Sequence, residues 1–363
     1  MTQLIAPDDL RQRVAHILKC AGSDDPEAHA VADNLVMANL SGHDSHGVGM
    51  VPRYVDAVLE GGLAPNTGVR VQLDTGALLT LDGQRGYGQI VGTQAMQLGM
   101  ARARQHGSCT VALGRAHHLG RIGHFAEMAV AEGLLSIHFV NASGSVLVAP
   151  HGGVDRRFST APYCVGIPRP GQDPLLLDFA TSIVAEGKVL VASQGGKKVP
   201  EGALIGPDGK PSNDPHLLYG DYTPTGPRNH AQGTGAIRAF GDHKGSGLAF
   251  MCEMLGGSFS GNGATDPARG RFANGMLSFY LDPKVFDPEG FFPKDIAKYV
   301  AFVKSSRPVA AGGEVLVPGE PESRMRAERA ANGVPLPDDT WAAIVETARS
   351  VGLDERRIQQ ATM

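Results

Sequence analysis

Two short stretches of the chain combine histidine with glycine: SGHDSHGVGMVPRY at 41–54 and HHLGRIGH at 117–124. Histidine is the side chain whose unperturbed pKa places its charge change nearest neutral pH. Glycine lets the backbone approach a ligand closely or adopt a positive φ. Together these residue types indicate a proton-transferring site beside a cofactor, with His46 and His118 as candidates. Taken alone, a loop histidine is more often a surface or capping residue.

Three charged residues can complete such a site. Arg121 follows a glycine just before a predicted helix, where backbone N–H groups bind phosphate and a guanidinium adds a two-pronged hydrogen bond. Asp178 ends the apolar run of LLLDFATS, and a carboxylate there either orients a histidine or caps the next segment. Lys244 falls in the first turn of a predicted helix, which disfavours a cation unless it meets an anion such as a cofactor phosphate.

Composition and missing motifs narrow the function classes. The chain of 363 residues is 42% hydrophobic and carries a net charge of −4, so it is globular and lacks the basic footprint of a nucleic-acid binder. It has no apolar run long enough for a membrane span and no signal-peptide core, and its four cysteines are widely spaced, so a reduced, cytoplasmic protein is expected. No GxGxxG follows a predicted strand, and GxSxG and Walker loops are absent.

The histidines also allow a metal site. His43 and His46 form an HxxH pair, and His117 and His118 add two more imidazoles, which is a ligand set for zinc. No second carboxylate–histidine spacing in the sequence supports a metal site. A metal-dependent hydrolase or lyase is therefore the alternative from a different class.

Apolar periodicity predicts a mixed α/β fold with helical ends. Helices are expected at 8–20, 25–40, 51–60, 88–106, 122–132, 243–255, 293–304, 338–351 and 354–362. Strands are expected as a hairpin within 69–82 and at 109–113, 134–140, 174–179 and 275–282, with long surface loops over 195–240. Because helices bracket the α/β middle, we expect a discontinuous helical domain of 1–80 plus 290–363, with a central domain of 81–289 inserted into it.

Five motifs occur in the order known from one enzyme family: DSHGVGMVPRY, HHLGRIG, LLLDFATS, DHKGSGL and LVPGE. On these motifs the chain resembles, from end to end, the malate/L-lactate dehydrogenase type-2 family, and most of all its hydroxycarboxylate dehydrogenase B branch. The resemblance implies reduction of 2-oxo acids with the cofactor NAD or NADP in its reduced form, or the reverse oxidation of 2-hydroxy acids. It also implies a homodimer and a non-Rossmann nucleotide-binding domain at 81–289.

The resemblance further implies roles for individual residues. Ser45 and His46 take the places of a serine–histidine pair in which His46 gives a proton to the carbonyl oxygen, with Asp178 as the acidic partner. His118 stands where the ureidoglycolate branch has its acid/base, so the two histidines compete for that role. The dinucleotide is expected along His46, Gly120, Arg121, Ile122, Leu176, Leu177, Asp178, Phe179, Ala180, His243, Lys244, Asn274, Val317, Pro318, Gly319 and Glu320.

The chain departs from the family pattern at positions that bear on substrate. Met50 stands where many members have an arginine able to bind the substrate carboxylate, and Arg53, one helical turn on, can replace it. The sequence STAP at 159–162 replaces the usual GTNP, and Ser246 replaces an aromatic residue. Substrate contacts are expected at Arg53, Met50, His118 and Thr160, and malate is disfavoured. A cyclic imine carboxylate is the alternative substrate, and a paralogue that binds nucleotide without turnover is a further alternative.

Overall fold

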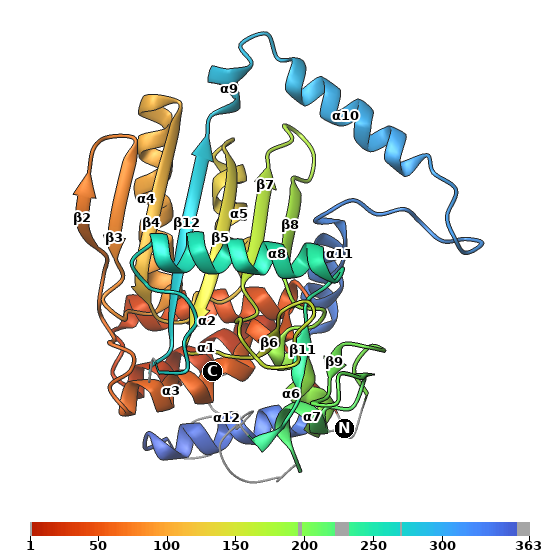
Figure 1. Cartoon of the computed structure of the whole chain (residues 1–363). Helices are drawn as coiled ribbons and strands as arrows, with labels where there is room; N and C mark the ends of the chain where they lie inside the picture. Colours follow the sequence, from red (N-terminus) through yellow and green to blue (C-terminus); the bar gives the residue numbers. More distant parts are fainter. Residues whose placement is uncertain (1, 195–197, 222–231, 269–270, 354–363) are drawn as a thin grey trace.

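The fold is built on a seven-stranded sheet in the order β2-β3-β4-β12-β5-β7-β8 (Figure 1). The computed structural model describes residues 2–194, 198–221, 232–268 and 271–353, and the helix expected at 354–362 lies outside them. The strands are β2 (Arg70–Asp74), β3 (Leu78–Asp82), β4 (Ser108–Ala116), β12 (Ala273–Leu281), β5 (Leu135–Ser143), β7 (Pro162–Ile167) and β8 (Leu175–Ala180). Only β3 and β4 pair in parallel, and the other neighbouring pairs are antiparallel. The mixed α/β class predicted from the sequence is confirmed.

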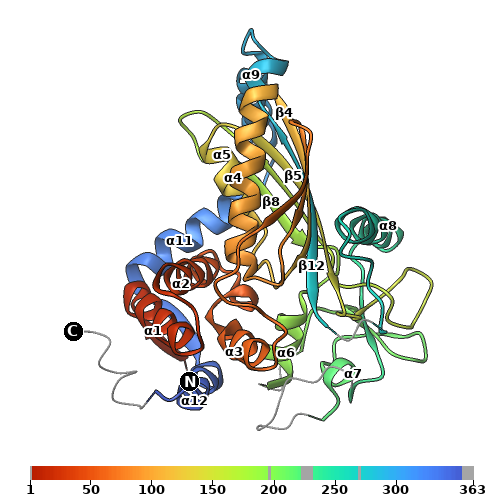
Figure 2. The same cartoon turned by 90° about the vertical axis from the view of Figure 1, so that its left-hand side faces the viewer.

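Helices cover both faces of this sheet, with α4 and α5 on one side and α8 on the other (Figure 2). Their bounds are α4 (Gly88–His106), α5 (Gly123–Ala131) and α8 (His243–Cys252), and α8 continues as a π-helix over Glu253–Phe259. Ala95 and Met96 of α4 pack in one core cluster with Val111, Leu113 and Tyr280 of the sheet. Burying an apolar side chain of this size contributes roughly 1.5–3 kcal/mol, so α4 is fixed firmly against the strands.

The two ends of the chain share a second core. It joins α1 (Pro7–Cys20), α2 (Asp25–Leu40) and α3 (Val51–Leu59) to α12 (Asp338–Ser350). Leu10, Leu35 and Tyr54 pack in this cluster with Ile344. Strand β1 (Thr2–Ile5) pairs antiparallel with β13 (Val334–Pro337) beside it. The packing joins the two segments that the domain prediction groups together, while the boundaries at 80/81 and 289/290 stay a prediction.

The prediction of long surface loops over 195–240 is wrong in part. Within its described part, 198–221 and 232–240, lie β9, β10, β11 and α7, whereas 195–197 and 222–231 fall outside the described residues. The three strands join β6 in a small sheet of order β10-β9-β11-β6, and α6 packs in the same core. The elements are β6 (Val148–Ala149), β9 (Leu204–Ile205), β10 (Pro211–Ser212), β11 (Ala236–Arg238), α6 (Glu186–Gln194) and α7 (His216–Tyr219). Leu204, Leu218 and Ile237 are fully buried between them. Strands of two or three residues are too short to leave a periodic signal in the sequence.

An arm follows β12 and extends away from the body of the molecule (Figure 1). It consists of α9 (Pro283–Phe286) and α10 (Phe291–Lys304), and the chain then returns through α11 (Glu320–Asn332). Aromatic side chains stay exposed along the arm, with Phe286 at 67% and Phe302 at 72% of their surface. Among the described residues, no helix is long and apolar enough to cross a membrane.

His138 lies in β5 and is completely buried. Its ring nitrogens are within hydrogen-bond distance of two hydroxyls, Ser278 Oγ at 2.8 Å and Ser136 Oγ at 3.0 Å. Burial lowers the pKa of His138 to about 3, because a charged imidazole loses its hydration inside the sheet. The histidine is therefore neutral throughout the pH range in which the protein is expected to work.

We expect acid to destabilise the protein through His138. The unfolded chain protonates this imidazole near the ordinary value of 6.5, and the folded chain does so only near pH 3, so the free energy of unfolding falls as the pH drops below 6.5. Between pH 7 and pH 5 the loss from this group is about 2 kcal/mol. Urea titrations at pH 7 and pH 5 measure this loss of unfolding free energy, and the loss should be smaller by that amount in His138→Gln than in the wild type. The exposed control His16→Gln should keep the wild-type loss, and an equal loss in all three proteins would contradict the expectation.

Candidate active site

Ser45 and His46 lie in the first of two short 3-10 turns between α2 and α3. Asn39 of α2 pins this segment: its Nδ2 donates to Asp44 Oδ1 at 2.7 Å, and its Oδ1 accepts from Val48 N at 2.8 Å. A Cβ on Gly47 would lie 2.1 Å from Asn39 Oδ1, so only glycine fits beside the amide. The direction in which the serine and the histidine project is thereby fixed by the end of α2.

The His117–Leu119 turn, which carries the second histidine, is held from two sides. Leu119 N donates to Asn274 Oδ1 of β12 at 2.8 Å, and Asn274 Nδ2 donates to Asn141 O at 2.8 Å. On the other side, α4 begins directly against the turn, because a Cβ on Gly88 would lie 2.2 Å from His118 O. The amide of Asn274 is thus engaged inside the sheet, and its expected contact with a dinucleotide stays a prediction.

These supports bring His46 and His118 face to face. Their rings are stacked, with centroids 5.6 Å apart and an interplanar angle of 7°. Ser45 Oγ lies 3.1 Å from His46 Nδ1, as the predicted serine–histidine pair requires. Two imidazoles this close cannot readily carry charge together, since like charges oppose each other's protonation. The stacking therefore disfavours a state in which both rings are charged.

A hydrogen-bond chain reaches His118 from behind. Gln89 Nε2 of α4 donates to Tyr54 OH of α3 at 2.8 Å, and Tyr54 OH lies 2.7 Å from His118 Nδ1. Neither Tyr54 nor Gln89 was expected at the site, because each looks like an ordinary helix residue in the sequence. No local spacing indicates that residues 35 positions apart join in one chain of bonds.

The direction of this chain defines the protonation of His118. An amide nitrogen only donates, so the Tyr54 oxygen accepts a hydrogen bond from Gln89. The Tyr54 hydroxyl in turn donates a hydrogen bond to His118 Nδ1. Burial keeps the Tyr54 hydroxyl protonated by raising its pKa. Burial, and then the nearby His46, hold the pKa of His118 well below its usual value. The imidazole of His118 is therefore neutral at pH 7 and carries its single proton on Nε2.

An aromatic and cationic wall stands beside the two histidines. The Arg53 guanidinium lies 5.3 Å from the ring centre of Phe272, a cation–π contact. The same ring packs against His117 and His118, at centroid distances of 5.6 and 5.9 Å. Burial, followed by the positive charge of Arg53, lowers the pKa of His117 to about 4. Arg53 is thus a cation close to the histidines, in keeping with its predicted role, whereas Phe272 was not predicted.

The N-terminus of α6 closes another side of the site. A Cβ on Gly187 would lie 2.6 Å from Ser45 Cβ, so α6 packs directly on the serine. The neighbouring Glu186 accepts from Tyr219 OH at 2.8 Å, and its charge partly opposes the depression of the His118 pKa. Glu186 is therefore a carboxylate close to the histidines, and it was not predicted from the sequence.

Two predicted substrate residues have different surroundings. Met50 is 7% exposed and packs in the terminal core, so an arginine there would have to enter that core. Thr160 is partly buried, and its carbonyl accepts from Thr181 N at 3.0 Å. The preceding Ser159 donates through its N–H and its hydroxyl to the buried carboxylate of Glu253, at 3.0 and 2.7 Å. The loop at Thr160 is therefore held by the π-helix behind it.

Asp178 lies at the N-terminus of α5. Its Oδ2 accepts from Gly123 N at 2.7 Å, which satisfies one of the unpaired donors of that helix. Burial raises the pKa of Asp178, while the charges of His43 and Arg121 oppose the rise. Asp178 therefore caps an earlier helix and not the segment that follows it, and its partnership with His46 stays a prediction.

Most of the remaining residues expected at the dinucleotide lie on or against β8, an edge strand of the large sheet, whereas His243 and Lys244 begin α8. At the start of β8, Leu176 N donates to Pro318 O at 3.2 Å, and a Cβ on Gly319 would lie 3.2 Å from Leu176 N. At the end of β8, Phe179 packs against Phe240 with ring centroids 5.2 Å apart, just before α8. Val317 N donates to Glu320 at 3.0 Å. Leu177 is exposed and Ala180 is partly buried, on either side of Asp178 in β8, and His243 and Lys244 are exposed.

The donors on this strip suit a phosphate-bearing ligand. Gly319 on this strip has a φ of +98°, so it presents bare backbone where a side chain would be strained. Gly120 has a φ of +74° but is buried against Asn34 and Gln89, so its contact with a dinucleotide stays a prediction. Arg121 is 3% exposed beside Glu127, and its Nε has no hydrogen-bond partner. Ile122 is buried next to it. A guanidinium with an unused donor and glycine backbone are the groups that a dinucleotide phosphate requires.

The four histidines of the metal alternative do not form one cluster. In the described part of the chain, no three histidine, cysteine or acidic side chains are grouped to hold a metal ion. His43 points to Glu322, with 3.5 Å between Nε2 and Oε1, whereas His46 stacks on His118.

We expect Tyr54→Phe to change the tautomer of His118 without changing the packing of the ring. Loss of the hydroxyl removes the donor at Nδ1, so the preference for a proton on Nε2 should weaken. Nitrogen-15 NMR of histidine-labelled protein should report an unprotonated Nδ1 in the wild type and a mixture in the variant. Tyr87→Phe, at 5.8 Å from the Tyr54 ring, is the matched control and should resemble the wild type. A protonated Nδ1 in the wild type would refute the assignment.

The chain is similar to known proteins over nearly its whole length. The family model described as malate/L-lactate dehydrogenase matches residues 5–345. Hydroxycarboxylate dehydrogenase B of Escherichia coli K12 is 40% identical, over 96% of this chain and 95% of that protein. A solved structure from Escherichia coli has a TM-score of 0.91 at 39% identity, covering 99% of this chain and 98% of that one. A delta1-piperideine-2-carboxylate reductase from Pseudomonas syringae has a TM-score of 0.78 at 25% identity, with coverages of 95% and 99%. The chain belongs to the malate/L-lactate dehydrogenase family.

Proposed function

We propose that the protein transfers a hydride between NAD(P)H and a 2-oxo acid, or in reverse from a 2-hydroxy acid to NAD(P)⁺. The family and its hydroxycarboxylate dehydrogenase relative support the reaction class. The stacked pair of His46 and His118 is the observation that carries the proposal. It offers one imidazole to give a proton and one neutral imidazole to hold the oxygen that receives it.

The two histidines have different roles in this proposal. Reduction of a ketone leaves negative charge on its oxygen, and the hydride itself is the chemistry that a bound nicotinamide supplies. His46, oriented through Ser45 at Nδ1, delivers the proton from Nε2 as general acid. His118 donates its Nε2–H to the same oxygen and stays neutral, since Tyr54 already donates to Nδ1.

Charged groups near the pair assign the rest of the substrate and the cofactor. Arg53, beside Phe272, binds the carboxylate of the 2-oxo acid. Arg121, close to Asp178, and Lys244, in the first turn of α8, bind the cofactor phosphates. In this proposal Asp178 belongs to the cofactor side of the site, because its carboxylate accepts a hydrogen bond from Gly123 N. The carboxylate beside the histidines is that of Glu186. Either NAD or NADP is compatible with this set of cations.

A cyclic imine carboxylate is the second candidate substrate. The structural similarity to the piperideine carboxylate reductase supports it. The same residues would act, with His46 giving its proton to the imine nitrogen and Arg53 binding the ring carboxylate. The two substrates differ in the atom that receives the proton and share the carboxylate.

Consumption of NADH or NADPH with a panel of 2-oxo acids, followed by absorbance of the reduced nicotinamide, tests the proposal. We expect turnover with at least one acid and a loss of about 100-fold or more in His46→Ala, because general acid catalysis contributes that much. His118→Asn keeps a donor and should lose less than His118→Phe. The imine substrate belongs in the same panel.

The outcomes separate the candidates. Turnover of the imine alone would assign the second substrate. Cofactor binding by fluorescence without turnover of any compound would indicate a paralogue that only binds nucleotide. Near-normal activity of His46→Ala, with loss in His118→Asn, would transfer the proton-donor role to His118. Absence of both binding and turnover would refute the dehydrogenase proposal.

We also propose that the protein is a homodimer joined through the arm. Exposed aromatic side chains in such a group mark interaction surfaces in soluble proteins. They are Phe286, Phe291, Tyr299 and Phe302, each exposed by 65% or more. A second copy is the occupant that the family resemblance implies.

Replacing Tyr299 and Phe302 together by serine should yield monomers. In the proposed interface each subunit buries these two aromatic side chains, so their loss weakens the dimer. The other residues of α10 are unchanged, so the helix itself should still form. Sedimentation velocity should show a dimer for the wild type and a species of half the mass for the variant. Lys298→Ser on the same helix is the control and should stay dimeric. A monomeric wild type would contradict the proposal.

A further inference from the structure

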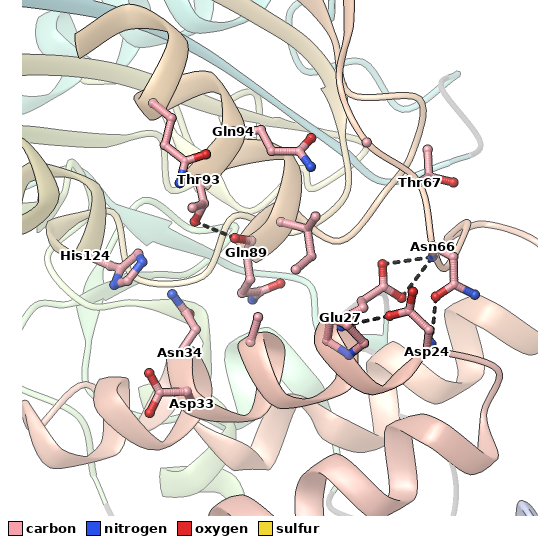
Figure 3. A pocket seen from close by; sticks show the side chains of 15 residues that line it. Asp24, Glu27, Asp33, Asn34, Asn66, Thr67, Gln89, Thr93, Gln94 and His124 are labelled. Carbon is pink, nitrogen blue, oxygen red and sulfur yellow. Dashed lines mark hydrogen bonds between the residues drawn. The ribbon is translucent and has the colours of Figure 1, made fainter. Parts of the chain in front are cut away.

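A second pocket lies behind the site, between α2 and α4 (Figure 3). Its volume is about 580 Å³, enough for a ligand the size of an amino acid. The lining comes from α2, α4, the segment 66–68 and His124. It is separated from His118 by the Gln89–Tyr54 hydrogen bond, so one side chain, Gln89, belongs to both the pocket and the site.

Polar atoms in this pocket lack partners. Asn34 is 5% exposed, and neither its Oδ1 nor its Nδ2 has a hydrogen bond. Gln89 is 3% exposed, and its Oε1 is likewise unpaired, although its Nε2 donates to Tyr54. Burying such atoms without partners costs about 1–3 kcal/mol each. Asn34 and Gln89 both line the pocket, as Figure 3 shows, and their unpaired groups are two amide oxygens and the NH2 group of Asn34.

The charge of the pocket selects the kind of ligand. Three carboxylates line it, those of Asp24, Glu27 and Asp33, and among the described residues no lysine or arginine lines it. Arg11, outside the lining, pairs with Asp33 at 2.7 Å. Glu27 is held in place, since both its oxygens accept from Asn66 N at 2.8 and 2.9 Å. Burial lowers the pKa of His124, so this side chain adds no positive charge at neutral pH. Negative charge together with unused acceptor oxygens favours a ligand rich in N–H donors.

We infer that this pocket is a second binding site, for a small organic cation of the amine or guanidine class. Its N–H groups donate to Asn34 Oδ1 and Gln89 Oε1, and its charge is balanced by Glu27 and Asp33. A ligand that engages Gln89 Oε1 also holds the amide whose Nε2 donates to Tyr54. Occupancy therefore stabilises the tautomer of His118, a consequence that rests on the proposed function, whereas the binding itself does not.

Calorimetric titration of the protein with agmatine, without substrate or cofactor, tests the binding. Asn34→Leu keeps the volume and removes both polar atoms, and it should weaken binding about tenfold or more, the loss of one charge-assisted hydrogen bond. Asn34→Asp should bind more tightly than the wild type. Absence of heat, or equal affinities of the wild type and Asn34→Leu, would overturn the site. Equal binding of the neutral probe acetamide would overturn the preference for a cation.

Two acidic residues provide a matched pair of variants. Asp33 and Asp8 both accept from Arg11, at 2.7 and 2.8 Å, but only Asp33 lines the pocket. Asp33→Asn should weaken agmatine binding and Asp8→Asn should not, and equal effects would refute the role of the pocket. The coupling has its own readout, since agmatine should sharpen the Nε2-protonated signal of His118 by NMR in the wild type and not in Tyr54→Phe. Binding without that change would overturn the coupling and leave the site.

Discussion

The backbone of the His117–Leu119 turn lies directly against the first residue of α4, and the candidate site depends on that approach. Glycine at position 88 permits it, because any Cβ would meet the carbonyl of His118. The approach brings Gln89 to Tyr54, and Tyr54 to His118. A displacement of α4 by the thickness of one methyl group would separate this chain of donors and acceptors, and the neutral imidazole would lose its defined proton.

The site joins parts that have little else in common. α2 and α3 belong to the terminal core, α4 and β12 to the large sheet, and α6 to the small sheet. The two histidines meet where these units adjoin, so that no single unit contains both His46 and His118. Buried polar groups that are fully paired, such as the Glu253 carboxylate behind the Thr160 loop, keep the surrounding backbone from relaxing.

Local signals explain what the sequence could predict. The bounds of α4 and α2 agree with the predicted 88–106 and 25–40. The start of α2 carries a local signal, since proline lies in its first turn, and the residue that caps the helix is Asp24. Ser45, His46 and His118 were identified from their motifs, and the structure brings them together. Strand β7 was missed, because its proline and glycine are poor strand formers in isolation, and β1 and β13 were missed because each is defined by a partner at the other end of the chain.

The unpredicted site residues share one property. Tyr54, Gln89, Phe272 and Glu186 have functional neighbours only in three dimensions, and nothing in their flanking residues differs from an ordinary helix or loop. Asp178 illustrates the converse: its motif was identified correctly, but a carboxylate at a strand end serves a helix N-terminus as readily as a histidine, and here it binds Gly123 N. Residue type restricts the chemistry, and only the tertiary arrangement determines the partner.

The pairing of β1 with β13 constrains how the protein is made. Ile5 leaves the ribosome more than 300 residues before Val334, its partner in the strand pair. At synthesis rates of about 5–20 residues per second, the first helices wait roughly 15–60 s for the segment that completes their core. During that interval their apolar faces are open to chaperones, and the final closure joins contacts of very high sequence separation, which is intrinsically slow. Assembly of the terminal core is therefore expected to be a late, post-translational event.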